Sequence, residues 1–169
     1  MHKQMRNNTF EDNNERIITA AQRGDMDIIR ELIHQGADVN TQNKDGMTPL
    51  IVAVYNHHHD AVKLLLALGA DVNIADASGS SALMGAAIKG YTDIAGYLIV
   101  AGAGFNTQNR NGSTALMLAV MYERDNVLEL LLEKGADPHL SDRDGRTAAD
   151  IASQQGNQQA LTLICQSTL

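Results

Sequence analysis

Three positions in this chain recur every 33 residues, and this regularity restricts the possible folds more than any other feature of the sequence. Glycine occupies two of the positions and alanine the third, and no insertion or deletion separates the copies. The three sets are Gly46, Gly79, Gly112 and Gly145; Gly36, Gly69, Gly102 and Gly135; and Ala20, Ala53, Ala86, Ala119 and Ala152. Such a period predicts a stack of similar units with a shared core, because a single short unit cannot bury its own apolar face.

Within each period the residue types predict a turn followed by two helices. Residues 43–46 (Asn-Lys-Asp-Gly) are typical of a turn. Thr48 then gives a good helix N-cap, and Pro49 follows at the first helical position, where a missing N–H costs nothing. We expect a short helix over residues 50–56 and a second helix over about residues 60–68, so the fold class is all-α.

Apolar residues recur with the same period and predict the core between the helices. The three columns are Ile17, Leu50, Leu83, Leu116 and Ala149; Leu32, Leu65, Leu98, Leu131 and Ile164; and Ile33, Leu66, Ile99, Leu132 and Cys165. The single cysteine, Cys165, cannot form an internal disulfide, and its place in a core column predicts a buried side chain rather than a reactive thiol.

The turns and helix ends resemble the ankyrin repeat family. Residues 45–53 carry most of the family pattern D-x-x-G-x-T-P-L-H-x-A, and residues 65–73 (Leu-Leu-Ala-Leu-Gly-Ala-Asp-Val-Asn) match its closing segment. The resemblance implies a solenoid of about five helix-turn-helix repeats with projecting β-turn tips. It also implies a concave surface, made by the tips and the first helices, that binds other proteins and carries no chemistry of its own.

The repeat boundaries follow from this pattern. We predict a polar N-terminal lead-in over residues 1–13 and a single ankyrin-repeat domain over residues 14–169. The outer two repeats should act as caps, because terminal repeats need a polar outer face and the last helices are rich in glutamine. The repeats are expected at about residues 14–42, 43–75, 76–108, 109–141 and 142–169.

Composition limits the possible partners and compartments. The net charge of −7 disfavours DNA or RNA, because phosphate binding needs a concentrated positive surface. No stretch approaches 18 consecutive apolar residues, so we expect no membrane span, and the polar start predicts no signal peptide. A cytoplasmic monomer without cofactors is the expectation. Self-association through an apolar stripe is an alternative.

Candidate chemical sites are few. His57, His58 and His59 fall in the turn between two helices, where three consecutive side chains cannot all face one metal ion. We expect a structural role, with His57 at a position of positive φ, and keep metal or small-molecule binding as the alternative function. The regularly spaced acids lie at repeat turns, where they satisfy backbone groups. No catalytic group and no metal site is predicted, so the protein should not be an enzyme.

The predicted binding site is the inner face of the first helices with the neighbouring turn tips. Exposed apolar side chains there would mark a contact surface. Ile51, Met84 and Met117 share this face, but they fit a groove between repeats equally well. The residues we predict to bind the partner are Met47, Tyr55, Ile88, Lys89, Arg110, Met121, Tyr122, Arg143 and Arg146.

The same face carries more basic than acidic residues, against the sign of the whole chain. The basic residues are Arg23, Lys44, Lys89, Arg110, Arg143 and Arg146, against Asp45 and Asp144. Including two further turn acids, Asp76 and Asp142, reduces the excess to two. The sequence therefore predicts a non-enzymatic scaffold that binds an unidentified protein on its concave face, in an adaptor role or an inhibitor or immunity-type role.

Overall fold

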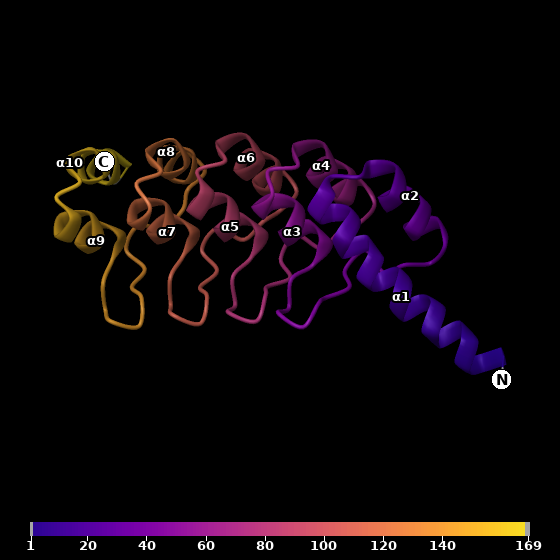
Figure 1. Cartoon of the computed structure of the whole chain (residues 1–169). Helices are drawn as coiled ribbons and strands as arrows, with labels where there is room; N and C mark the ends of the chain where they lie inside the picture. Colours follow the sequence, from indigo (N-terminus) through magenta and orange to yellow (C-terminus); the bar gives the residue numbers. More distant parts are fainter. Residues whose placement is uncertain (1, 168–169) are drawn as a thin grey trace. The chain divides into compact units, whose positions relative to one another are not determined.

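The computed structural model describes the backbone of residues 2–167 and the side chains of residues 12–167. This part of the chain forms ten helices joined by short turns (Figure 1). They are α1 (His2–Arg23), α2 (Met26–His34), α3 (Pro49–Tyr55), α4 (His59–Ala67), α5 (Ala82–Lys89), α6 (Thr92–Val100), α7 (Ala115–Met121), α8 (Asp125–Glu133), α9 (Ala148–Gln155) and α10 (Gln158–Ser167). The predicted all-α stack of helix pairs is confirmed.

The first of two compact units covers residues 1–77. Helix α1 packs against both α2 and α3, and α3 packs against α4. From residue 2 onward, the predicted lead-in is the first part of α1. The side chains of residues 2–11 and all of residue 1 lie outside the described part. The single domain over residues 14–169 and its repeat boundaries stay predictions.

The second unit covers residues 78–169 and arranges its helices in two layers. Helices α5, α7 and α9 lie side by side in one layer, while α6, α8 and α10 form the other (Figure 1). Each first-layer helix packs against the second-layer helix that follows it. The turns that precede α7 and α9 project from the first layer (Figure 1).

Hydroxyl side chains begin the first helices of four successive repeats. The hydroxyl oxygen of Thr48 accepts a hydrogen bond from the N–H of Ile51, and Pro49 occupies the first helical position, as predicted. Ser81, Thr114 and Thr147 cap α5, α7 and α9 in the same way. Because a side-chain cap satisfies an N–H that has no partner inside the helix, these residues fix where each helix begins.

Two of the predicted apolar columns and the alanine column contribute to the core. Leu32, Leu65, Leu98, Leu131 and Ile164 are all buried, as are the five alanines that recur with the period. The column that starts at Ile17 is buried through Leu116, but Ala149 is only half-buried. The third column is not fully buried as predicted: Ile33, Leu66, Ile99 and Leu132 are half-buried and Cys165 is exposed. Each of these residues directly follows a residue of the buried column in the sequence.

Candidate partner-binding surface

Asparagine and aspartate side chains hold the tips of the turns in shape. The Oδ1 atom of Asn43 accepts hydrogen bonds from the backbone N–H groups of Asp45 and Met47, both at 2.9 Å. Asn109 and Asp142 make the same pair of bonds in their own turns. Among the regularly spaced acids, Asp38, Asp71, Asp137 and Asp142 are therefore backbone acceptors, as predicted.

A ladder of backbone hydrogen bonds joins successive tips. In the second unit, the N–H of Arg110 donates to the carbonyl of Ser78, and the N–H of Arg143 donates to the carbonyl of Asn111, both at 3.0 Å. Gly112 has a φ of +77°, and a Cβ atom there would lie 2.7 Å from the nitrogen of Arg143. The recurring glycine therefore serves two needs, a left-handed backbone and close approach of the next tip.

In the first unit, two of the predicted binding residues are partly accessible. Met47, just after the tip, and Tyr55, the last residue of α3, are both half-buried. Ile51 lies between them on the same face of α3 but is only 1% exposed. The open question about Ile51, Met84 and Met117 is thereby answered, because all three belong to the core.

In the second unit, the apolar candidates gather at the ends of α5 and α7. Ile88 and Met121 occupy equivalent positions one repeat apart and are half-buried. Tyr122, the C-cap of α7, is 45% exposed. The Nε–H of Arg124 donates to the carbonyl of Ile88 at 3.1 Å, so the two helix ends are tied together. Ile88, Met121 and Tyr122 therefore lie at two helix ends that this hydrogen bond connects.

Basic side chains lie at the end of α5 and in the tips before α7 and α9. Lys89, Arg110 and Arg143 are exposed. The guanidinium groups of Arg110 and Arg143 form no hydrogen bond or ion pair with any residue whose side chain is described. Both arginines sit in tips that are held by the ladder, so their side chains project from fixed backbone positions and remain available for an acidic partner group.

Arg146 differs from these two arginines because it is already paired. Its guanidinium lies 2.8 Å from the carboxylate of Asp142 and 3.1 Å from that of Asp144. Burial alone would raise the pKa of Asp142, but the hydrogen bonds from the backbone and guanidinium of Arg146 and from the N–H of Asp144 outweigh it, so the pKa is lowered. Arg146 thus contributes to the shape of its own turn, and less positive charge remains there than the sequence count suggests.

Within the histidine run, His57 and His58 have structural roles. His57 has a φ of +60°, as predicted for its position in the turn. The ring of His58 lies 2.9 Å from the carbonyl of Gln22 through Nε2, and since a carbonyl only accepts, Nε2 carries the proton. Among the residues with described side chains, no cluster of three histidine, cysteine, aspartate or glutamate residues could hold a metal ion.

The exposure of Cys165 contradicts the prediction that its side chain is buried. Its side chain is exposed on α10, beside Leu161 and Gln166 in a shallow groove of about 290 Å³. The prediction was wrong because a place in this column does not fix burial: the equivalent residues Ile33, Leu66, Ile99 and Leu132 are themselves only half-buried. The alignment therefore identified the position but not its exposure.

The sequence pattern did not identify two residues that directly affect this surface. Arg124 and Gln155 each donate a side-chain N–H to a carbonyl of the preceding repeat, at Ile88 and Met121 respectively. No recurring signal marks them, because Arg124 is the N-cap of α8 and Gln155 is the last residue of α9, so they are not at equivalent positions of the 33-residue period. They fix the helix ends that carry the apolar candidates.

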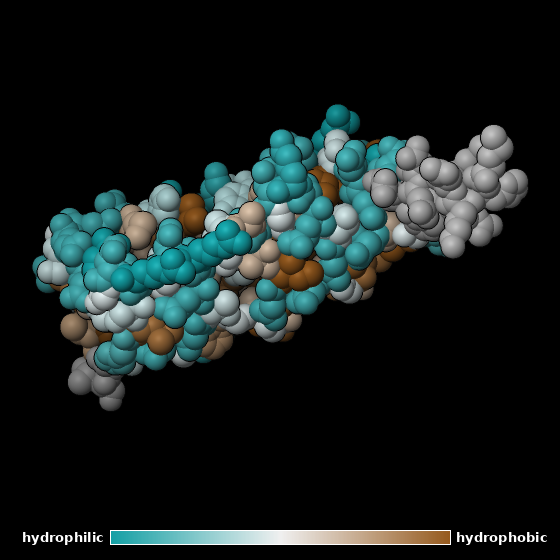
Figure 2. All heavy atoms as spheres, turned by 90° about the horizontal axis from the view of Figure 1, so that it is seen from below, coloured by the Kyte–Doolittle hydropathy of each residue, from teal (hydrophilic) through white to brown (hydrophobic). Residues whose placement is uncertain are grey.

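The hydropathy of the surface limits how a partner could bind. Figure 2 looks at the molecule from below the view of Figure 1, toward the turn tips, and hydrophilic residues predominate there among those that are coloured. Hydrophobic residues occur in small, separate groups. Binding on this side would therefore depend on a few apolar anchors within a polar surround, the usual composition of a binding hot spot.

Comparison with known proteins gives one family. A model for ankyrin repeats in three copies matches residues 17–109 and again residues 83–168. No individual curated protein matches the chain. Within the described residues, no helix combines the length and the apolar character needed to cross a membrane.

Proposed function

Because the chain belongs to the ankyrin repeat family, we propose that it binds a partner protein at the tips and first-helix ends of residues 78–169. Ankyrin repeats are generally protein–protein interaction modules and are typically not enzymes. We call the proposed contact region of this unit the anchor surface. It consists of Ile88, Lys89, Arg110, Met121, Tyr122, Arg143 and Arg146.

The observation that carries this proposal is the exposure of Tyr122 at the end of α7. A tyrosine that is 45% exposed, next to half-buried Met121 and one repeat from half-buried Ile88, leaves apolar area in water that a partner could cover. Aromatic side chains dominate hot spots because they bury a large area at a small cost in conformational entropy. In the first unit, Tyr55 occupies the position equivalent to Ile88 and Met121, and Met47 lies just before the N-cap Thr48.

The charged residues of the anchor surface would act differently from the apolar ones. Arg110 and Arg143 are exposed and form no ion pair with any described side chain, so they can attract an acidic partner before contact is made. Exposed charges mainly change the association rate, whereas buried apolar anchors mainly change the dissociation rate. We propose an adaptor or inhibitor role in the cytoplasm, carried out by a monomer through surface complementarity alone.

The proposal is tested by affinity capture from the cells in which the protein is made, with the full chain as bait. A Met121→Ala, Tyr122→Ala variant should lose the captured protein. A Val100→Ser variant is the matched control, because Val100 is 88% exposed but lies on α6, away from the anchor surface. Equal capture by the wild type and the anchor variant would contradict the proposal. Loss with Val100→Ser alone would indicate that the partner binds the second-layer helices instead.

A further inference from the structure

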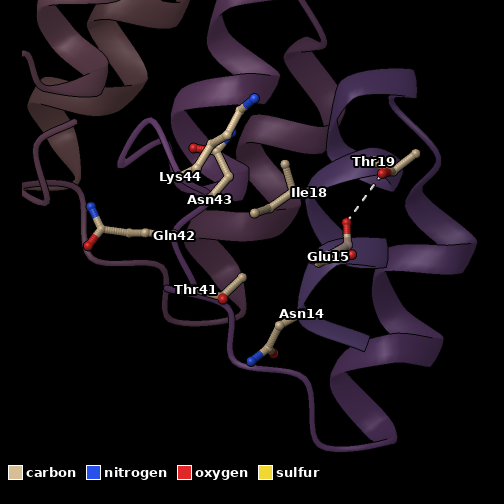
Figure 3. A pocket seen from close by; sticks show the side chains of 8 residues that line it. All are labelled: Asn14, Glu15, Ile18, Thr19, Thr41, Gln42, Asn43 and Lys44. Atoms are coloured by element: carbon tan, nitrogen blue, oxygen red, sulfur yellow. Dashed lines mark hydrogen bonds between the residues drawn. The ribbon is translucent and has the colours of Figure 1, made fainter. Parts of the chain in front are cut away.

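A groove of about 570 Å³ separates α1 from the turn that begins the second repeat (Figure 3). The whole groove lies within the first unit, and it shares no residue with the anchor surface. Figure 3 shows Asn14 and Ile18 pointing from α1 toward the facing loop. The groove is lined by Asn14, Glu15, Ile18 and Thr19 of α1 and by Thr41, Gln42, Asn43 and Lys44 of the loop.

The loop side of this groove is the open end of the hydrogen-bond ladder between tips. In the next tip of the same unit, the N–H of Ala77 donates to the carbonyl of Asp45 at 2.9 Å. Lys44 occupies the position equivalent to Ala77, but the preceding repeat has helix α1 where a tip would stand. No residue with a described side chain or backbone accepts the N–H of Lys44.

The direction of this N–H follows from the shape of its turn. Asn43 and Gly46 close the turn with a 2.9 Å bond from the Gly46 N–H to the Asn43 carbonyl, and the turn from Asn109 to Gly112 has the same bond at the same length. Within that matching turn, the N–H of Arg110 points toward the preceding repeat. The N–H of Lys44 therefore points toward α1, across the groove.

The groove has three amide side chains, and the NH₂ group of Gln42 already donates to the carbonyls of Gly46 and Ala75. The other two, Asn14 and Asn43, are oriented as donors toward the groove. Asn14 Oδ1 accepts the N–H of Asp38 at 2.9 Å, and Asn43 Oδ1 accepts two backbone N–H groups of its own turn. Since a backbone N–H can only donate, these contacts identify the oxygen of each amide, and each NH₂ group is left for a ligand. With the N–H and the ammonium of Lys44, the groove offers several donors to one bound group.

We propose that this groove binds an extended acidic segment of another protein. A main-chain carbonyl of the segment accepts the N–H of Lys44 and so continues the ladder. A carboxylate of the segment lies at the loop end, near the Lys44 ammonium and the Asn43 amide. Glu15 on the opposite wall repels acid at the α1 side, which fixes the direction of the segment. The groove thus extends binding to a region that the anchor surface does not include.

A proline at residue 44 removes the backbone N–H and so tests its role separately from that of the Lys44 ammonium. Lys44 is the second residue of its turn, where the fixed φ of proline is favoured, so Lys44→Pro should fold with an unchanged melting temperature. Arg110→Pro is the matched control. It makes the same change in the matching turn but removes an N–H that donates to Ser78, and it should lower the melting temperature. Lys44→Ala removes the charge and keeps the N–H.

The binding test uses a phage-displayed library of random peptides selected on the full-length protein and counter-selected on Lys44→Pro. Peptides rich in aspartate and glutamate should enrich. A synthetic copy should bind Lys44→Pro at least tenfold more weakly than wild type, Lys44→Ala with an intermediate loss, and the Met121→Ala, Tyr122→Ala variant normally. The proposal is overturned if no peptide distinguishes the wild type from Lys44→Pro, or if the enriched peptides are not acidic.

Discussion

The carboxylate of Asp142 lies 2.8 Å from the guanidinium of Arg146 and also accepts the backbone N–H of the same residue at 2.9 Å. Asp142 is only 8% exposed, although it lies in a turn. Asn43 and Asn109, at equivalent positions, make the backbone bonds without a charge. The last turn of the stack therefore adds an ion pair to a hydrogen-bond pattern that the other turns already have.

This comparison separates the charge of Asp142 from its hydrogen bonds. Asp142→Asn should be mildly destabilising at neutral pH, because an amide oxygen can keep both backbone bonds while the ion pair is lost. Asp142→Ala removes all of these acceptors and should cost about 1–2 kcal/mol of the free energy of unfolding. Denaturant unfolding of both variants measures the difference. Equal losses would show that the backbone bonds contribute nothing.

The contribution of the Asp142 charge should depend on pH in a defined direction. Because folding lowers the pKa of Asp142 from its ordinary 3.8, the charged carboxylate favours the folded state. This stability is fully present above the unfolded-state pKa and is lost as the pH falls through the folded-state pKa. The stability gap between the wild type and Asp142→Asn should be constant near neutral pH and should close below about pH 4. A gap that widens in acid would contradict this assignment.

Neighbouring leucines on α4 test the assignment of the core. Leu65 is fully buried and Leu66 is half-buried. Leu65→Ala should cost about 2–5 kcal/mol, because the surroundings cannot collapse completely around the cavity. Leu66→Ala should cost clearly less, and it is the matched control. Chemical denaturation of the two variants gives the comparison, and the reverse order would mean that the faces of α4 are misassigned.

Two glycines with the same φ of +77° isolate the contact between tips. At Gly112 a Cβ atom would lie 2.7 Å from the nitrogen of Arg143, whereas at Gly145 it would meet nothing within 4 Å. Both alanine variants have the backbone strain of a left-handed conformation, about 1–2 kcal/mol. Only Gly112→Ala should have an additional loss from pushing the next tip away. The midpoints of thermal unfolding check this, and equal shifts would rule out a stabilising contact between the tips.

The sequence predicts the features that are repeated and local. A period of 33 residues, hydroxyl N-caps such as Thr48 and Asx turns such as that of Asn43 depend on nearby residues, so they are confirmed in detail. Burial depends on what packs against a helix from elsewhere, which explains the error at Cys165. Periodicity also could not decide whether Ile51 belongs to the core or to the surface. A short helix that packs beside another repeat buries a wide face, and the sequence pattern does not show where that face ends.

The candidate site was predictable only in part for the same reason. The sequence located the tips and helix ends, but it counted Arg146 with the available charges, although its own turn neutralises it. Equally, nothing in the residue pattern showed that the N–H of Lys44 lacks a partner. That follows from the replacement of a tip by helix α1, which only the structure reveals.

The most direct test of partner binding at the anchor surface is the kinetics of the captured partner on immobilised protein. Met121→Ala with Tyr122→Ala should raise the dissociation rate constant about tenfold or more, because apolar anchors determine how long a complex lasts. Arg110→Glu with Arg143→Glu should instead lower the association rate constant, and this effect should shrink as salt screens the charges. Unchanged rate constants for both folded variants would contradict the assignment of the anchor surface.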